Sequence, residues 1–257
     1  MNIAVCIKQV PDTAELKLDP ETNTLIRDGV DAVLNPLDDF ALEAALRLRQ
    51  AAGGTVTAVT MGPPQAEDIL RKARAMGVDE AVLVSDRAFA GADTWATSLT
   101  LAMALRQLGP YDLILCGKQA IDGDTAQVGP GIAAHLGIPQ VTYVTRIDWH
   151  EGRLLVNRLL DGGTVRLAVP LPACLTVLKE ANEPRLPTLA ARVDALRDQP
   201  RRMGLGDVRL PPKDTGLEGS PTRVVRIRVP TGARQLVRLE GSPEDIVERL
   251  AYVLRTP

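Results

Sequence analysis

The sequence predicts an α/β protein with a doubly wound, mainly parallel β-sheet that is extended by antiparallel strands and followed by a C-terminal arm and helix. Three observations lead to this prediction. Short apolar runs alternate with helical patterns up to residue 137, closely spaced strand patterns continue to residue 178, and residues 198–222 are rich in Pro, Gly and charge. We therefore expect an α/β domain over residues 1–197 and an arm with a terminal helix over residues 198–257.

The first half alternates between strands and helices. Short apolar runs predict strands over residues 3–10, 55–61, 80–84 and 112–116. Apolar residues three or four positions apart predict helices over residues 37–51, 65–76, 94–108 and 126–136. A polar turn between Lys17-Leu18-Asp19 and Thr24-Leu25-Ile26 predicts a small hairpin. Strand–helix alternation with short connections is typical of a parallel sheet with helices on both faces.

The second half begins with a different spacing. Turn residues separate strand-like runs that we interpret as antiparallel, over residues 141–149, 153–159, 164–169 and 173–178. A short amphipathic helix is expected over residues 188–197. Residues 198–222 show no periodic apolar face and are interpreted as an arm rather than a core element. The last helix, residues 243–254, begins after Ser242 as N-cap. Such an arm suits docking on another chain, and folding back on its own domain fits the pattern equally.

Composition excludes several classes of function. The 257-residue chain has a formal net charge of −2, so it lacks the excess of positive charge that favours binding to nucleic acid or to an anionic membrane surface. It has no apolar run near the roughly 20 residues that a membrane span needs. The N-terminus MNIAVCIKQVP lacks a basic start followed by a cleavable apolar segment. We expect a soluble, cytoplasmic protein without direct membrane insertion.

Cysteine and histidine offer little chemistry. Cys6, Cys116 and Cys174 show no CxxC spacing and lie in or beside apolar runs, so we expect buried, reduced thiols. His135 and His150 are the only histidines, and two isolated histidines make neither a metal cluster nor an evident triad. The sequence therefore predicts no metal site and no catalytic side chain.

The stretch CGKQAIDGDTAQVGP, residues 116–130, directly follows a predicted buried strand. Ligands of open parallel sheets bind beyond the carboxyl ends of the strands. Gly123 and Gly129 let backbone approach a ligand closely, and Gln119, Thr125 and Gln127 supply hydroxyl and amide partners. GxxxxGK[ST] does not occur, so a mononucleotide or a pyrophosphate held mainly by backbone fits better than a triphosphate. An ordinary turn followed by a helix cap is the alternative.

Two other loops follow strands in the same way. SDRAFAGADTWATS, residues 85–98, places Asp93 or Thr94 as the cap of a helix. LNPLDDFALEAALRL opens a helix at Asn35-Pro36 and carries acidic residues in its first turn. Together the three loops could surround one nucleotide.

The motifs VCIKQVPDT, LNPLDDFALEAALRL, GKQAIDGDTAQVGP and LKEANEPRLPTLAAR occur in this order and resemble the beta subunit of electron transfer flavoprotein. That resemblance implies a heterodimer with an alpha subunit, which carries most of the contacts to a redox-active FAD. It also implies that residues 1–197 form a nucleotide-binding domain, that the arm contacts the alpha subunit, and that the beta subunit binds an adenine nucleotide. By position, the nucleotide site comprises Cys6, Asn35, Pro36, Leu37, Asp38, Met61, Gly117, Lys118, Gln119, Ala120, Ile121, Asp122, Gly123, Asp124, Thr125, Ala126, Gln127 and Val128.

The family has two branches. In one the nucleotide is a structural AMP. In the other, electron-bifurcating branch it is a second FAD that takes hydride from NADH and sends electrons to the alpha FAD and to ferredoxin or flavodoxin. DGDTAQVGP and DRAFAGADTWATS look like the bifurcating branch, and Asp93, Thr94 and Thr97 would supply donors for the second half of a dinucleotide. A longer loop that only caps a helix is the alternative.

The segment NEPRLPTLAAR resembles the loop with which beta subunits anchor an acyl-CoA or related dehydrogenase, or a quinone reductase. Leu189 matches the anchoring leucine, and a core-facing leucine of a short helix is the alternative. The flanking docking residues are Asn182, Glu183, Pro184 and Arg185. An enzyme that hydrolyses nucleotides or transfers adenylate is a third possibility, for which only Asp122 and Asp124 are candidate metal ligands.

Overall fold

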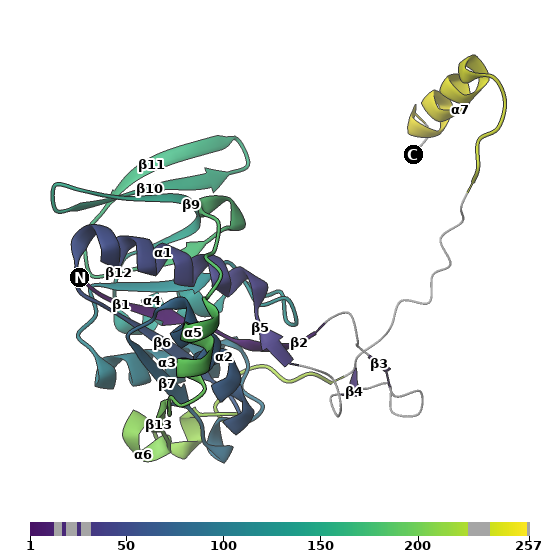
Figure 1. The fold of residues 1–257 in the computed structure, drawn as a ribbon. Coiled ribbons are helices and arrows are strands. Elements are labelled where there is room, and N and C mark those ends of the chain that lie inside the picture. Colours follow the sequence, from purple (N-terminus) through teal and green to yellow (C-terminus); the bar gives the residue numbers. More distant parts are fainter. Residues whose placement is uncertain (13–16, 19–24, 27–31, 226–236, 256–257) are drawn as a thin grey trace.

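The computed structural model describes residues 1–12, 17–18, 25–26, 32–225 and 237–255 (Figure 1). Its centre is a nine-stranded sheet with the strand order β11-β10-β9-β12-β8-β1-β6-β7-β13. The strands are β1 (Asn2–Cys6), β6 (Thr55–Met61), β7 (Glu80–Val84), β8 (Leu113–Gly117), β9 (Gln140–His150), β10 (Arg153–Leu160), β11 (Gly163–Val169), β12 (Ala173–Val177) and β13 (Arg201–Met203). β10 and β11 are antiparallel to their neighbours, and all other pairs are parallel. The predicted fold class is confirmed.

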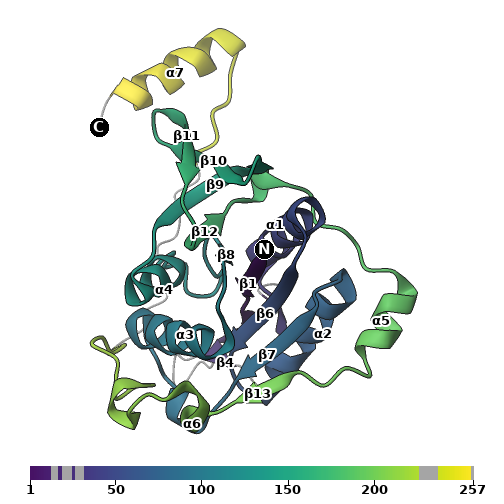
Figure 2. The same cartoon turned by 90° about the vertical axis from the view of Figure 1, so that its left-hand side faces the viewer.

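Helices cover both faces of the sheet (Figure 2). α1 (Pro36–Ala52) and α2 (Glu67–Met76) lie on one face, and α3 (Thr94–Leu108) and α4 (Val128–Leu136) lie on the other. Successive side chains of a strand point to opposite faces, so each buried strand supplies two cores. In β1, Ile3 and Val5 pack with α1 and α2, whereas Ala4 and Cys6 pack with α3 and α4.

Glycines and capping residues end or begin the helices close to the positions that the sequence predicts. α2 and α4 end at Gly77 and Gly137, which adopt left-handed φ angles of 111° and 68°. α3 begins where the carboxylate of Asp93 accepts a hydrogen bond from the N–H of Ala96. Helix prediction was therefore accurate, because a stop glycine or an N-cap acts within a few residues.

Several short elements complete the chain. The predicted hairpin is confirmed for the residues that the structure describes, since β3 (Lys17–Leu18) pairs antiparallel with β4 (Leu25–Ile26); Asp19 and Thr24 lie outside them. β2 (Gln9–Pro11) pairs with β5 (Ala32–Leu34). The remaining short elements are η2 (Pro64–Ala66), η3 (Arg87–Phe89), η4 (Lys179–Ala181), α5 (Leu189–Ala195), α6 (Leu205–Val208) and η5 (Pro212–Asp214).

Two predictions are wrong. We expected β12 to be antiparallel, but it runs parallel to both β8 and β9. We expected residues 198–222 to contribute no core element, but β13 pairs with β7 at the sheet edge and buries Met203, which is 1% exposed. In both cases pairing with a distant strand decided the outcome, and local pattern does not report such pairing.

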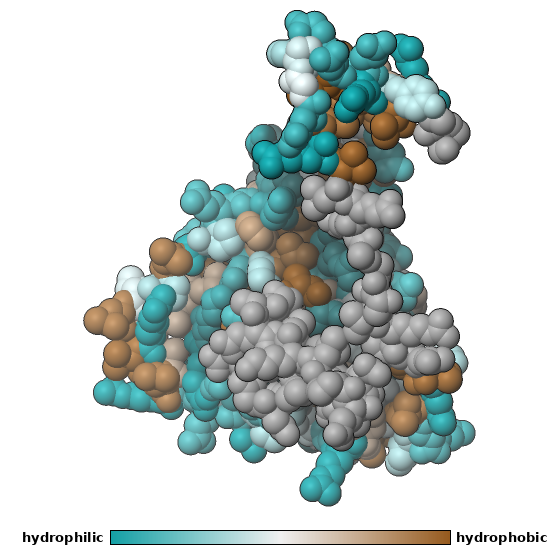
Figure 3. Space-filling view, turned by 90° about the vertical axis from the view of Figure 1, so that its right-hand side faces the viewer, coloured by the Kyte–Doolittle hydropathy of each residue, from teal (hydrophilic) through white to brown (hydrophobic). Residues whose placement is uncertain are grey.

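The chain ends in α7 (Pro243–Arg255), and its predicted start is confirmed because Ser242 Oγ accepts the N–H of Asp245 at 3.2 Å. Apolar side chains lie on its surface (Figure 3), among them Leu250 and Leu254, which are 47% and 78% exposed. Within the described residues, no helix combines the length and apolar character that crossing a bilayer requires.

Candidate functional site

The carboxyl ends of the parallel strands meet at one edge of the sheet, where the direction of strand order changes between β1 and β8. β1 leads through α1 to β6 on one side, whereas β8 lies on its other side and follows α3 on the opposite face. Open α/β sheets bind ligands in the crevice that such a switch leaves beyond the strand ends. Cys6 ends β1, Met61 ends β6, and Gly117 ends β8, so these predicted residues share this edge. The loop 118–127 leaves β8 at the switch point.

The backbone of this loop offers unpaired N–H groups. The N–H of Ile121 donates to Asn35 Oδ1 at 3.2 Å, and that of Asp124 donates to the carbonyl of Ala120 at 2.8 Å. The other N–H groups between Gln119 and Gly129 find no acceptor among the described residues. They include those in the first turn of α4, where helical geometry leaves N–H groups unused. Such an array favours an acceptor-rich ligand such as phosphate.

Asn35 joins three segments of the site. Its backbone N–H donates to the carbonyl of Lys8 at 2.9 Å, and its Nδ2 donates to the carbonyl of Gln119 at 2.9 Å. Its Oδ1 accepts the N–H of Ile121, as described above. The residue is 1% exposed, so its amide ties the start of α1 to the loop after β8. The sequence predicted that Asn35 lies at the start of α1, but it did not predict that its amide bridges these segments.

Asp38 is buried beneath the loop. Its Oδ2 accepts the N–H of Lys8 at 2.7 Å, and an added Cβ on Gly117 would lie 2.3 Å from its Oδ1. Only glycine therefore fits at the end of β8. Burial raises the pKa of Asp38 to about 8. Hydrogen bonds from Lys8, Asn35 and Gly117 favour the charged form and lower the pKa, but the effect of burial is larger. At neutral pH the carboxyl is mostly protonated, so it places little negative charge near a phosphate.

The two aspartates of the loop are compensated. Lys8 Nζ lies 2.8 Å from both carboxylate oxygens of Asp122, and the side-chain amide of Gln119 donates to Asp124. Lys8 thus neutralises a charge that would repel an anionic ligand. Among the described residues, neither aspartate belongs to a group of three or more His, Cys, Asp or Glu side chains that could hold a metal ion.

The second predicted loop lies beside the first. Thr94 Oγ1 donates to Gln127 Oε1 at 3.0 Å, which links the start of α3 to the start of α4. The carboxylate of Asp93 caps α3 and also accepts the N–H and Oγ1 of Thr222, at 3.0 and 2.7 Å. Partial burial alone would raise the pKa of Asp93, but these hydrogen bonds lower it. Thr97, whose N–H donates to the carbonyl of Asp93, lies in the first turn of α3 and is half-buried.

The three cysteines are buried and free, as predicted. Cys6 and Cys116 are register partners on β1 and β8, on the face covered by α3 and α4. The Sγ of Cys174 lies 3.5 Å from the carbonyl of Gly129, at the start of α4. All three side chains pack in the core between the sheet and helices α3 and α4.

Comparisons with known proteins agree with this geometry. Residues 22–200 match the electron transfer flavoprotein domain. The chain is 47% identical to the electron transfer flavoprotein subunit beta of Thermoanaerobacterium thermosaccharolyticum, over 100% of this chain and 98% of that protein. It is 50% identical to the caffeyl-CoA reductase-Etf complex subunit CarD of Acetobacterium woodii, over 88% and 87%, and 48% identical to protein FixA of Azorhizobium caulinodans, over 95% and 92%.

The chain belongs to the electron transfer flavoprotein family. Its similarity extends along nearly the whole length of curated beta subunits, so it is of the beta-subunit type, as the sequence motifs indicated. Electron transfer flavoprotein beta subunits pair with an alpha subunit and serve in electron transport.

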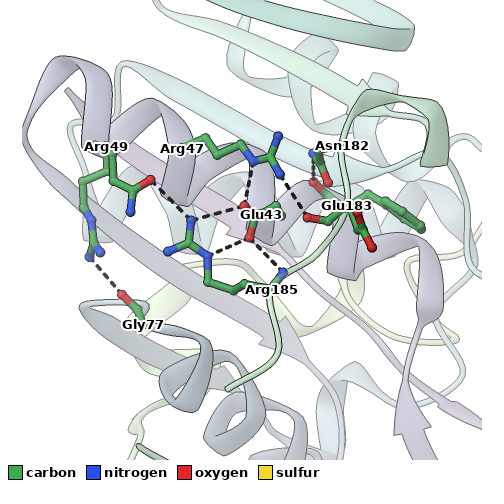
Figure 4. Close-up of polar contacts among 9 residues, drawn as sticks. Glu43, Arg47, Arg49, Gly77, Asn182, Glu183 and Arg185 are labelled. Atoms are coloured by element: carbon green, nitrogen blue, oxygen red, sulfur yellow. Dashed lines mark hydrogen bonds and ion pairs between the residues drawn. The ribbon is translucent and has the colours of Figure 1, made fainter. Parts of the chain in front are cut away.

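In this chain the predicted docking segment, residues 182–192, is anchored on α1 (Figure 4). Glu43, which is 3% exposed, accepts hydrogen bonds from Arg185 Nε and Arg47 Nε, each at 2.7 Å. Arg47 also donates to the carbonyl of Glu183 at 3.1 Å, and Asn182 Nδ2 donates to the carbonyl of Phe40 at 2.9 Å. Asn182 and Arg185 therefore hold the segment in place and point inward.

The leucines of the segment point outward. Leu189 is 79% exposed at the start of α5, so the alternative of a core-facing leucine is wrong. Leu186 is 87% exposed, although sequence reasoning did not select it. The sequence indicates this exposure, since Leu186 lies between Pro184 and Pro187 and an apolar residue in such a segment cannot belong to the core-facing side of a helix. A groove of about 500 Å³ runs between this segment and α2.

Proposed function

We propose that this chain is the beta subunit of a heterodimeric electron transfer flavoprotein and that it binds FAD at the carboxyl edge of its sheet. Bound FAD would supply the redox chemistry, which is hydride uptake from NADH and one-electron delivery to the alpha-subunit FAD and to ferredoxin or flavodoxin. Our reasons for the FAD-containing branch are the DGDTAQVGP and DRAFAGADTWATS motifs. NADH as donor agrees with the expected cytoplasmic location.

One observation carries the nucleotide proposal. The loop at the switch point presents unpaired backbone N–H groups between Gln119 and Gly129. In the proposed complex these groups bind phosphate oxygens, while the buried carboxyl of Asp38 and the Lys8–Asp122 pair keep the local charge low. The chain thus binds and orients the nucleotide, and none of its side chains needs to act as a nucleophile or base.

Structural AMP is the second candidate, and one contact favours it. The carboxylate of Asp93 was expected to help hold the second half of a dinucleotide, but it is occupied by Ala96 and Thr222. Thr94 Oγ1 already donates to Gln127 Oε1, so Thr97 is the one side-chain donor left of these three residues. AMP does not need a donor from the α3 loop.

The stoichiometry of released nucleotides distinguishes the two candidates. The purified heterodimer is denatured, and FAD and AMP are separated and quantified per alpha–beta pair. We expect two FAD and, in the intact protein, bleaching of flavin absorbance on anaerobic addition of NADH. One FAD and one AMP without an NADH response would assign the AMP-binding function instead. Consumption of ATP with release of an adenylated product would support an adenylating enzyme and refute both.

The partners follow from exposed apolar surfaces. We propose that Leu189 enters a pocket of an acyl-CoA or related dehydrogenase, or of a quinone reductase. CarD is named as a subunit of a caffeyl-CoA reductase complex, which supports an oxidoreductase of CoA thioesters as the partner. We further propose that the C-terminal arm contacts the alpha subunit through α7, whose Leu250 and Leu254 are exposed.

A further inference from the structure

Tyr143 has a backbone conformation that strands do not normally contain. It lies in β9 with a φ of +58°, in the left-handed region that a bulky residue rarely adopts. Here β9 changes register against β12 between Leu175 and Val177. The N–H of Tyr143 donates to Thr176 Oγ1 at 3.2 Å, and the carbonyl of Val144 accepts from Leu178 at 2.9 Å. Strain of this kind persists only where surrounding contacts hold it, and it gathers at functional sites.

The strained residue changes which side chains face the core. In a regular strand, residues 141 and 143 point to the same face. In β9, Val141 is buried and the next buried residue is Val144, which is fully inaccessible, whereas Tyr143 is 38% exposed. The bulge therefore directs the Tyr143 ring to the surface, at the carboxyl ends of β8 and β12.

The ring lies beneath a lysine of the ligand loop. Lys118 Nζ is 5.7 Å from the centre of the Tyr143 ring, and the N–H of Lys118 donates to the carbonyl of Val177 at 3.0 Å. A cation over an aromatic face is attracted to it without losing its charge. In the described part of the chain no carboxylate pairs with Lys118, whereas Lys8 is paired with Asp122. Lys118 is therefore a cation of the loop that the protein leaves uncompensated.

We propose that Lys118 contacts a phosphate group of the adenine nucleotide and that Tyr143 is a positioning residue that holds Lys118 for this contact. The inference rests on the proposed nucleotide site. Lys118 stands at the start of the loop whose N–H groups are unpaired, so a charge and an array of dipoles would act on the same anion. The phenol hydroxyl has no part in this, because the ring face alone attracts the ammonium group.

The test measures binding of AMP and of adenosine to the alpha–beta heterodimer after its beta-site nucleotide has been removed. AMP is the adenine half of FAD, so this probe serves whichever nucleotide the site holds. We expect Lys118→Met to weaken AMP binding about tenfold, since it removes one charge-assisted contact, and to leave adenosine binding unchanged. Lys118→Arg should restore most of the affinity for AMP.

Variants of Tyr143 separate positioning from direct contact. Tyr143→Phe should bind AMP like the unmodified protein, because the ring is kept. Tyr143→Leu should weaken AMP binding about threefold, and should have no further effect when combined with Lys118→Met. Heterodimer elution and circular dichroism check the fold, and if Tyr143→Leu does not fold, Tyr143→Phe and Lys118→Met still decide the matter.

Several results would overturn the inference. Unchanged AMP affinity in Lys118→Met would remove the phosphate contact, and an added loss from Tyr143→Leu in that background would show that Tyr143 does not act through Lys118. Equal losses for AMP and adenosine would indicate a structural role. If the unmodified heterodimer binds neither AMP nor FAD at this site, the proposed function fails, and this inference fails with it.

Discussion

The buried carboxyl of Asp38 should make the stability of this protein fall as pH rises. Its pKa is about 8 in the folded chain and about 3.8 in the unfolded chain. Between these values the folded state holds one proton more than the unfolded state, so the free energy of unfolding decreases with increasing pH. The slope is about 1.36 kcal/mol per pH unit, which gives a loss of about 4 kcal/mol between pH 5 and pH 8.

The substitution Asp38→Asn removes this proton and keeps a side-chain oxygen that can accept the N–H of Lys8. Urea unfolding of both proteins at pH 5, 6, 7 and 8 should show the variant gaining stability relative to the original chain as pH rises. Taking the difference between the two proteins cancels other titrating groups, and unchanged m-values would show that the unfolded states are comparable. Parallel pH profiles would refute the reasoning, because they would mean that Asp38 ionises in the fold as easily as in the unfolded chain.

Three further predictions concern single side chains. Gly117→Ala should cost about 1–3 kcal/mol of stability, because its Cβ would lie 2.3 Å from Asp38 Oδ1. Gly123→Ala should be nearly neutral, because its Cβ would have no atom within 4 Å, and equal urea midpoints for the two variants would contradict this prediction. Leu189→Ala should weaken partner binding by up to about 1.5–3 kcal/mol without changing flavin content, as measured by electron-transfer kinetics and flavin absorbance; loss of flavin would argue against a docking role. Glu43→Gln should leave Arg47 and Arg185 without the carboxylate that pairs with them, and should therefore increase the rate of proteolysis within residues 183–196. An unchanged cleavage rate would show that other contacts hold the segment.

Sequence reasoning was accurate where the signal was local. Apolar periodicity and stop glycines located the main helices within about two residues, and the glycine-rich stretch after β8 does lie at the switch point of the sheet. It failed where pairing was long-range. β12 returns to the parallel sheet only after the excursion through β10 and β11, and a strand of five residues carries no mark of its direction. β13 begins with two arginines and has three residues, so it shows no apolar alternation.

The candidate site shows the same division. The position of the loop at the end of a buried strand was predicted, and its role in binding phosphate stays a prediction that rests on its glycines and small polar residues. The bridge by Asn35, the pairing of Lys8 with Asp122 and the position of Tyr143 were not predicted, because each joins segments far apart in sequence. A bulge in β9 depends on register with β12, and the sequence VTYV does not report that register.

Helix α1 connects the two sites proposed for this subunit. Its first turn contacts Lys8 and the end of β8 through Asp38, and its later turns hold the docking segment through Glu43 and Arg47. At a rise of about 1.5 Å per residue, Asp38 and Glu43 are separated by about 7–8 Å along the helix axis. One rigid helix that carries contacts to both sites keeps the nucleotide loop and the docking segment at a constant separation, whereas two sites on separate loops would not.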